Sequence, residues 1–163
     1  MSDERRTDAE VRIAAAGEQD AVVAMIAGFR DFYEESTPDD ATIERMVAQL
    51  IEDDRTDFLL VGEPAVGFAA IRYRPSVWTG VEDAWLEDVF VVESERGKGT
   101  GRALLEACLE RAAERGCKRV QLDANERNEG AVVLYESLGF RNRVPDRFDD
   151  GRNLYFTRWL NAE

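Results

Sequence analysis

A glycine-rich basic segment in the second half of the chain sets the strongest constraint on its fold. It reads Arg-Gly-Lys-Gly-Thr-Gly over 96–101, and it stands between an apolar run at 85–92 and a stretch whose apolar residues recur at helical spacing. Three glycines allow the backbone to approach a ligand closely, and the amides that begin a helix attract anions. The order of strand, loop and helix therefore predicts an anion-binding turn; a solvent-facing glycine turn is the alternative.

The spacing of the glycines excludes the two common nucleotide-binding loops. A Walker A loop ends in Gly-Lys-Ser/Thr, whereas Lys98 is followed by Gly99. A dinucleotide fingerprint that begins at Gly97 or Gly99 needs a further glycine at 102 or 104, where arginine and leucine stand. A different anionic ligand is therefore expected.

The net charge limits the kinds of molecule that the protein is expected to bind. The 163 residues include 21 Lys and Arg against 34 Asp and Glu, which gives a net charge of −13. A field of that sign repels phosphodiester backbones, so nucleic acid is not an expected partner. Apolar runs fall short of the roughly 18 residues that span a bilayer, and the first residues lack the apolar core of a signal peptide. We therefore expect a cytoplasmic protein without a membrane partner.

The residue types that are missing limit the possible chemistry. The chain has no histidine, and its two cysteines are Cys108 and Cys117. This composition excludes Ser-His and Cys-His catalysis and leaves too few ligands for a zinc site, so we expect no metal. Catalysis would depend on carboxylates, tyrosine or backbone amides.

The basic residues are unevenly divided between lysine and arginine. Lysine occurs at Lys98 and Lys118, and the other 19 of the 21 basic residues are arginine. High acidity with few lysines is the composition expected of a protein that works in concentrated salt, where self-repulsion is screened. We interpret the chain as halophilic; an acidic protein that happens to prefer arginine is the alternative.

The apolar patterning predicts an α/β chain with one domain over 9–163, preceded by a disordered tail at 1–8. Strands and helices alternate irregularly along the chain, without repeats or linkers. This order favours a layered structure in which helices pack on a sheet. We expect strands over 11–15, 58–61, 66–73, 85–92, 120–123 and 154–160, and helices over 18–32, 43–51, 102–115 and 128–137.

Three motifs in one order resemble the GCN5-related N-acetyltransferase (GNAT) family. Arg-x-x-Gly-x-Gly at 96–101 is similar to its pyrophosphate-binding segment, and Trp-Leu-Glu-Asp-Val-Phe-Val-Val at 85–92 is similar to its central strand. The segments 125–131 and 134–140 are similar to its second cofactor-side motif. Within the family, Trp78, Leu86-Glu87-Asp88 and 66–69 look most like the diamine and polyamine acetyltransferases.

The resemblance implies a fold, a reaction and an assembly. The fold is that of the acyl-CoA N-acyltransferases, with a central mixed, mostly antiparallel sheet flanked by helices. The reaction is direct attack of a primary amine of a small molecule on acetyl-CoA in a ternary complex, and a polyamine-like acceptor is one option. A homodimer is expected. The alternatives are a peptide or protein N-terminal acetyltransferase and a non-catalytic acyl-CoA-binding domain.

The resemblance also assigns roles to individual residues. Glu87 is the expected base or ammonium ligand, Tyr135 the general acid for the leaving thiolate, and Asp88 and Trp78 further substrate contacts. Strand alternation would place Leu86 and Asp88 on one face and Glu87 on the other. An exposed acidic pair and an ordinary core tyrosine are the structural alternatives. The expected cofactor contacts are Val89, Phe90, Val91, Arg96, Gly97, Lys98, Gly99, Thr100, Gly101, Arg102, Asn128, Ala131 and Tyr135.

The halophilic interpretation predicts that removing salt destabilises the protein. Repulsion among carboxylates should lower the thermal midpoint at low ionic strength, because a net charge of −13 is then poorly screened. Thermal unfolding is measured from about 0.1 M to above about 1 M KCl, over which the Debye length falls from about 10 Å to about 3 Å. A midpoint that stays constant across this range would contradict the interpretation.

Overall fold

The computed structural model describes residues 10–142, which form two compact units that divide after Asp123. Expectations for the tail 1–8 and for a strand at 154–160 lie outside the described residues, and one domain over 9–163 stays a prediction. The larger unit contains β1 (Val11–Ile13), η1 (Ala16–Glu18), α1 (Gln19–Phe32), α2 (Asp40–Leu50), β2 (Thr56–Val61), β3 (Gly67–Pro75), β4 (Glu82–Val91), η2 (Glu93–Glu95), α3 (Thr100–Glu114) and β5 (Val120–Gln121). The smaller unit contains α4 (Glu129–Ser137).

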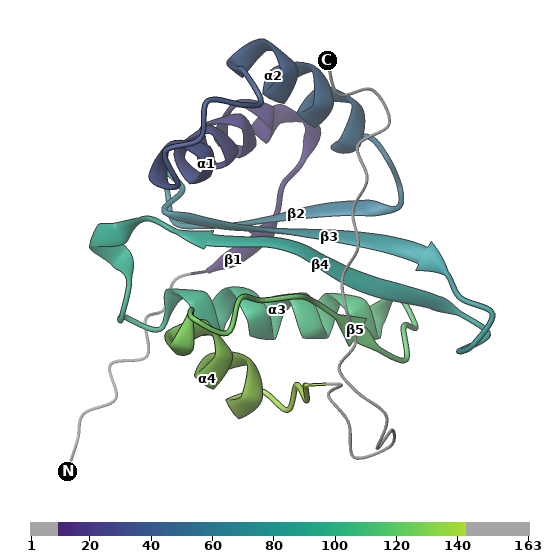
Figure 1. Cartoon of the computed structure of the whole chain (residues 1–163). Coiled ribbons are helices and arrows are strands. Elements are labelled where there is room, and N and C mark those ends of the chain that lie inside the picture. Colours follow the sequence, from purple (N-terminus) through teal and green to yellow (C-terminus); the bar gives the residue numbers. More distant parts are fainter. Residues whose placement is uncertain (1–9, 143–163) are drawn as a thin grey trace, which may run out of the picture. The chain divides into compact units, whose positions relative to one another are not determined.

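The larger unit is a five-stranded sheet with helices on both faces. The strand order is β1-β2-β3-β4-β5; neighbours pair antiparallel except β4 and β5, which are parallel. Helices α1 and α2 cover one face and α3 covers the other (Figure 1). The expected α/β fold with a mixed, mostly antiparallel sheet is confirmed.

The strand β2 shows why the sheet needs helices on both faces. All six of its residues are buried, and successive side chains of a strand point to opposite faces. Phe58 and Leu60 join the core under α1 and α2, where Val22 and Val47 are buried. The next residue along the strand, Leu59, belongs to the opposite face, which α3 covers. An apolar run without alternation thus predicts a strand covered on both sides.

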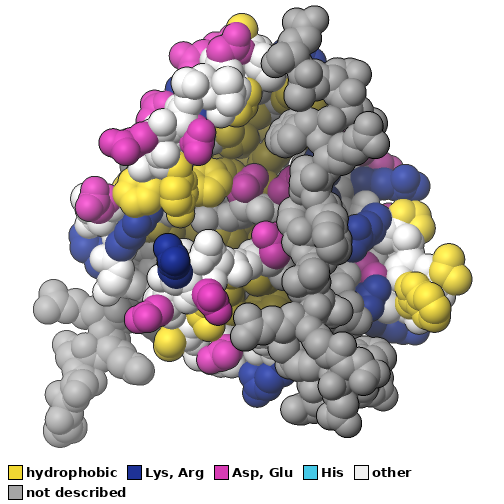
Figure 2. Space-filling view, in the orientation of Figure 1, with side chains coloured by type: hydrophobic (Ala, Val, Ile, Leu, Met, Phe, Trp, Pro, Cys, Tyr) yellow, Lys and Arg dark blue, Asp and Glu magenta, His cyan; other side chains and the backbone are white. Residues whose placement is uncertain are grey.

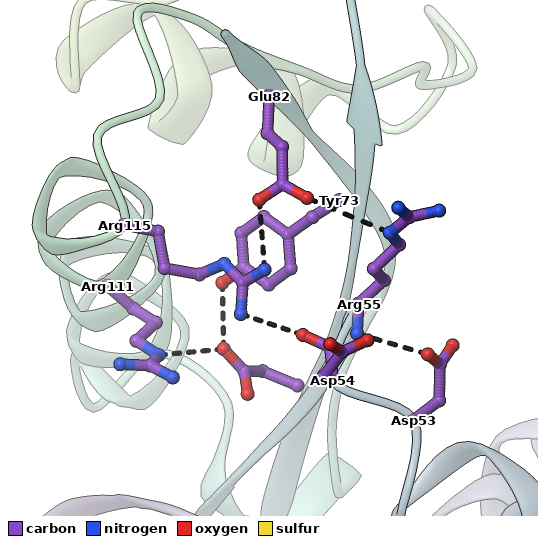
Figure 3. A network of polar contacts seen from close by, with 8 residues as sticks. Asp53, Asp54, Arg55, Tyr73, Glu82, Arg111 and Arg115 are labelled. Atoms are coloured by element: carbon purple, nitrogen blue, oxygen red, sulfur yellow. Dashed lines mark hydrogen bonds and ion pairs between the residues drawn. The ribbon is translucent and has the colours of Figure 1, made fainter.

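A network of charged groups fixes the C-terminal half of α3 to the sheet (Figure 3). Asp57 accepts hydrogen bonds from Arg111 Nε at 2.7 Å and from the Tyr73 hydroxyl at 2.8 Å. The Arg115 guanidinium lies 3.9 Å from the Tyr73 ring centroid and donates to Glu82 at 2.9 Å. Burial and the carboxylate of Asp57 raise the pKa of Tyr73, so its hydroxyl remains a donor. Because these contacts hold α3 against the sheet, they also help to fix where the helix begins.

Among residues 10–142, the helices are too short or too polar to cross a lipid bilayer.

The packing of the sheet predicts that Gly67→Ala is destabilising. An added Cβ would lie 3.0 Å from Val61 Cγ1, 3.1 Å from Leu104 Cδ1 and 3.1 Å from the carbonyl oxygen of Phe90. The carbonyl belongs to β4 and cannot move without breaking sheet pairing. We expect the free energy of unfolding to fall by about 1–3 kcal/mol, measured by chemical denaturation.

Gly28→Ala is the matched control, because the new Cβ meets one atom, Phe90 Cε1, at an ordinary 3.9 Å. Alanine is favoured over glycine inside a helix by about 1 kcal/mol, so this variant should be as stable as the wild type or more stable. A Gly67→Ala protein with wild-type stability would contradict the packing described for this corner of the sheet.

Candidate active site

The strand β4 pairs with β3 along its length, but with β5 over a much shorter stretch. In the described part of the chain, β5 pairs with β4 at Ala84 and Trp85, while β4 continues to Val91 (Figure 1). The outer edge of β4 beyond Trp85 therefore faces no strand among residues 10–142. This edge leads directly into the glycine-rich loop.

The pairing with β3 shows which backbone groups point to that outer edge. The Val92 amide donates to the Val66 carbonyl at 2.9 Å, and hydrogen-bonded and non-hydrogen-bonded positions alternate along an antiparallel pair. Phe90 therefore directs its amide and carbonyl toward β3. Val89 and Val91 direct theirs to the outer edge.

The two carboxylates of β4 lie at a β-bulge. Asp88 pairs with Ala70 and Leu86 pairs with Ile71, so Glu87 is the extra residue between the two pairs. Directly paired residues share a face of the sheet. The prediction that Leu86 and Asp88 lie on one face is therefore wrong, because the bulge interrupts the alternation. Asp88 shares the face of Ala70, which belongs to the core under α1 and α2.

Glu87 and Asp88 have different electrostatic surroundings. The Glu87 carboxylate is half-exposed and lies 3.6 Å from the Arg72 guanidinium. Burial raises the pKa of Asp88 to about 6, and the negative charges of Glu87 and Asp123 add to the shift. The Asp88 carboxyl can therefore exchange a proton near neutral pH.

Asp123 was not among the site residues expected from the sequence. Gln121, the last residue of β5, pairs in parallel with Trp85 of β4. Asp123 lies two residues after Gln121, and Glu87 lies two residues after Trp85. Parallel register therefore places Asp123 level with the bulge. The signal in the sequence is weak, because it depends on a strand pairing between segments 36 residues apart.

The glycine-rich loop joins β4 to α3 through two left-handed residues. Gly97 has φ of 72° and Gly99 has φ of 86°, a conformation that favours glycine. Gly99 precedes the first helical residue, the buried Thr100. The first amides of α3 have no carbonyl partner within the helix, and Gly99 has no side chain to cap them. The loop therefore leaves the first amides of α3 available to hydrogen-bond with a ligand.

Lys98 of the loop and Arg102 in the first turn of α3 lie beside acidic neighbours. Lys98 Nζ is 3.2 Å from Glu95 Oε1, and Arg102 Nη1 is 3.6 Å from Glu106 Oε1. These are surface pairs, which contribute little to stability. Because acidic neighbours balance these two positive charges, the backbone conformation of this loop distinguishes it from other surface loops more than its net charge does.

Arg96 makes contacts of another kind. Its Nε donates to the Val91 carbonyl at 2.9 Å, and its guanidinium lies 4.2 Å from the ring centroid of Phe32 and 5.6 Å from that of Phe90. The side chain joins the end of β4 to the end of α1. The family resemblance implied that Arg96 contacts the cofactor, whereas Phe32 was not among the expected site residues.

In the smaller unit, α4 carries the remaining expected cofactor contacts. The Asn128 side chain accepts a hydrogen bond from the Ala131 amide at 3.4 Å and so caps the helix. Tyr135 is partly buried, and its ring packs edge-on against Phe140 with centroids 5.9 Å apart. The cap is structural, and the roles of these residues toward a ligand stay predictions.

Trp78 lies in the turn between β3 and β4, at the opposite end of β4 from the glycine-rich loop (Figure 1). It is 91% exposed, whereas Glu87 and Asp88 lie farther along the strand. The expected acceptor residues are thus spread along β4.

Acidic side chains also occur on α1, α2 and the loop that connects them, among apolar and other side chains (Figure 2). Acidity is therefore a property of a broad surface, and it does not by itself mark the acceptor site.

Comparison with known proteins gives both relatives and fold neighbours. The thialysine N-epsilon-acetyltransferase of Sus scrofa is 35% identical over 85 residues, which cover 50% of this chain and 49% of that protein. The spermine/spermidine N(1)-acetyltransferase of Bacillus subtilis strain 168 is 40% identical over 58 residues, 35% of this chain and 38% of that one. The chain thus spans half or less of the length of these curated relatives.

A solved structure from Arthrobacter sp. FB24, whose own assignment as an acetyltransferase is provisional, superimposes with a TM-score of 0.82. It is 27% identical and covers 97% of this chain and 100% of its own. The model of the acetyltransferase (GNAT) family matches residues 22–140, which include both β4 and the glycine-rich loop. The expected family is confirmed: the chain belongs to the GNAT acetyltransferases.

Proposed function

We propose that this protein transfers the acetyl group of acetyl-CoA to a primary amine of a small molecule, by direct attack in a ternary complex. The observation that carries the proposal is the outer edge of β4, where Val89 and Val91 present backbone groups beside a loop of helix amides. Acetyl-CoA would supply the acetyl thioester. The residues of the chain would bind it, orient it and move protons.

The outer edge of β4 fits the pantetheine arm of acetyl-CoA. That arm is an extended chain with two amide groups, and an extended chain can pair with a strand edge as an added strand does. Val89 and Val91 direct their backbone groups outward, so they are the proposed main-chain contacts. Phe90 would contribute through its buried side chain, since its backbone faces β3.

The loop fits the pyrophosphate of the same molecule. Gly97, Gly99 and Gly101 keep side chains away from the first amides of α3, and the helix dipole favours negative charge there. Lys98 and Arg102 would add positive charge. Thr100 is buried, so its contribution would come from its amide. Asn128 and Ala131 of the smaller unit stay proposed cofactor contacts.

Asp88 is the carboxylate that we propose as the base, with Glu87 as a ligand for the substrate ammonium. A general base is most effective when its pKa lies near the working pH, and the pKa of Asp88 is raised to about 6. Glu87 is held near Arg72 at 3.6 Å and is more exposed. The family resemblance implied Glu87 as the base or ammonium ligand, whereas these surroundings favour Asp88 as the base.

The acceptor is proposed to be a small amine of the polyamine or thialysine type. The named relatives act on thialysine and on spermine or spermidine, and the carboxylates of β4 suit an ammonium ligand. The expected contact of Trp78 with the substrate stays a prediction, because Trp78 lies at the other end of β4 from the glycine-rich loop. Homodimer formation, a cytoplasmic location and salt adaptation stay predictions.

The direct experiment is a steady-state assay with acetyl-CoA against spermidine, thialysine and a peptide with a free N-terminus, in low and high KCl. Release of coenzyme A that depends on a small amine would support the proposal. Activity on the peptide alone would favour the N-terminal acetyltransferase. Coenzyme A binding without turnover on any amine would favour a non-catalytic domain.

The loop geometry predicts that Gly99→Val abolishes coenzyme A binding. The φ of 86° at Gly99 strains any other residue, and a side chain there would obstruct the first amides of α3. Binding is measured by calorimetry. Gly116→Val is the matched control, because Gly116 has φ of 81° at the other end of the same helix, with open space around it.

Both variants should lose comparable stability, but the control should still bind coenzyme A. Equal affinity in the two folded variants would contradict the assignment of the loop.

The raised pKa of Asp88 predicts a specific pH profile. The carboxylate accepts a proton when it is ionised, so kcat/KM should rise with pH through about 6. Asp88→Asn should lower kcat/KM by about 10²–10⁴ and remove that limb of the profile. Glu87→Gln should keep the limb and raise the KM for the amine. A limb that persists in Asp88→Asn would exclude Asp88 as the base.

The raised pKa of Asp88 also predicts how the stability of the protein depends on pH, and this prediction can be tested without measuring activity. The pKa is higher in the folded state than the reference value of 3.8, so ionising Asp88 costs folded-state stability as the pH rises from about 4 to about 6. Asp88→Asn should therefore raise the thermal midpoint at pH 8 more than at pH 4, relative to the wild type. Equal effects at the two pH values would contradict the shift.

Tyr135→Phe should reduce the rate of acetyl transfer far more than it changes coenzyme A affinity. Phenylalanine preserves the edge-on contact with Phe140 and removes only the hydroxyl, and general-acid help is worth about 10²–10⁴ in rate. The acetyl-transfer rate is measured before the steady state, so that product release does not mask it. An unchanged rate would make Tyr135 a packing residue.

A further inference from the structure

The Arg96 side chain turns back from the glycine-rich loop to the strand that precedes it. Its Nε donates to the carbonyl oxygen of Val91 at 2.9 Å. Val91 is buried, and its backbone groups point to the outer edge of β4. Arg96 therefore occupies the last outward carbonyl of β4 before the loop begins.

Aromatic rings of α1 hold the guanidinium in that position. Its central carbon lies 4.2 Å from the Phe32 ring centroid, and Phe32 lies 5.9 Å from Phe90 in β4. Phe29 packs against Phe90 at 5.2 Å, so the stack continues into the core. Arginine suits this place because its planar guanidinium stacks on the ring with its N–H donors in a fixed direction, whereas a lysine ammonium has no plane that could stack.

The hydrogen bond from Arg96 to the Val91 carbonyl changes which backbone groups of β4 can pair with an extended ligand. Without Arg96, Val89 and Val91 would each present one outward amide and one outward carbonyl. Two equivalent positions would allow an extended chain to bind in two registers, one shifted by two residues. With Arg96 in place, the Val91 carbonyl already accepts one hydrogen bond and keeps one lone pair. It is therefore a poorer acceptor for a ligand than the carbonyl of Val89, and the two positions are no longer equivalent.

We propose that Arg96, held by Phe32, sets the register in which the pantetheine arm pairs with β4. Arg96 is then a positioning residue that acts through the Val91 carbonyl, and a phosphate contact is not its main contribution. The proposal rests on the proposed binding of acetyl-CoA at this edge. It assigns to the end of α1 a part in cofactor binding.

S-acetylpantetheine distinguishes the two roles of Arg96, because it keeps the pantetheine arm and lacks the pyrophosphate. Arg96→Lys keeps the positive charge but loses the stack and the Nε donor, and Phe32→Leu removes the ring that holds Arg96. For each variant, kcat/KM is measured with acetyl-CoA and with S-acetylpantetheine as donor. We expect both variants to lose a similar factor with both donors, about 2–10-fold for one hydrogen bond.

The double variant and a conservative variant test the coupling between the two residues. Arg96→Lys with Phe32→Leu should be no worse than Arg96→Lys alone, since both changes remove the same contact. Phe32→Tyr keeps the ring and should retain the wild-type kcat/KM with both donors. Thermal midpoints of all variants confirm that each one is folded.

The outcomes separate failure of this proposal from failure of the proposed function. A loss in Arg96→Lys with acetyl-CoA, and none with S-acetylpantetheine, would make Arg96 a phosphate contact and overturn the register role. Additive losses in the double variant would overturn the coupling to Phe32. A wild-type protein that neither binds coenzyme A nor uses either donor would overturn the proposed function itself.

Discussion

The hydrogen-bonding groups on the outer edge of β4 are the constraint on which the candidate site depends. Buried backbone amides and carbonyls need partners, and β5 supplies them at Ala84 and Trp85 in the described part of the chain. Farther along, Val89 and Val91 point to the same side, toward a position where an extended ligand can pair. A sheet that β5 completed along its whole length would have no such position.

Elements next to this edge supply and hold the charged and hydrogen-bonding groups of the candidate site. The bulge at Glu87 turns Asp88 to the face under α1 and α2, where burial and two negative charges raise its pKa to about 6. On the other face, Asp57 and Tyr73 anchor α3 through Arg111. The helix that presents the loop amides is thus fixed at its far end, and Asp88 and the loop are held by separate sets of contacts.

The sequence was sufficient to predict most of the elements and the family, because apolar periodicity and the glycine spacing are local patterns. Residues 18–32 and 102–115 were expected as helices and are found within two residues of those bounds. The bulge was not predictable, because Leu86 to Asp88 read as regular alternation and only the register with β3 reveals the extra residue. Asp123 and Phe32 were missed because they reach the site through contacts between distant segments.

Residue-resolved amide exchange by NMR most directly tests the central claim, that the outer edge of β4 beyond Trp85 has no strand partner among residues 10–142. In the free protein, the amides of Val89 and Val91 should exchange faster than those of Asp88 and Phe90, which face β3. Saturating acetyl-CoA should slow exchange at Val89 and Val91 and leave their neighbours nearly unchanged. Protection of Val89 and Val91 in the free protein, or no change on adding acetyl-CoA, would contradict the account.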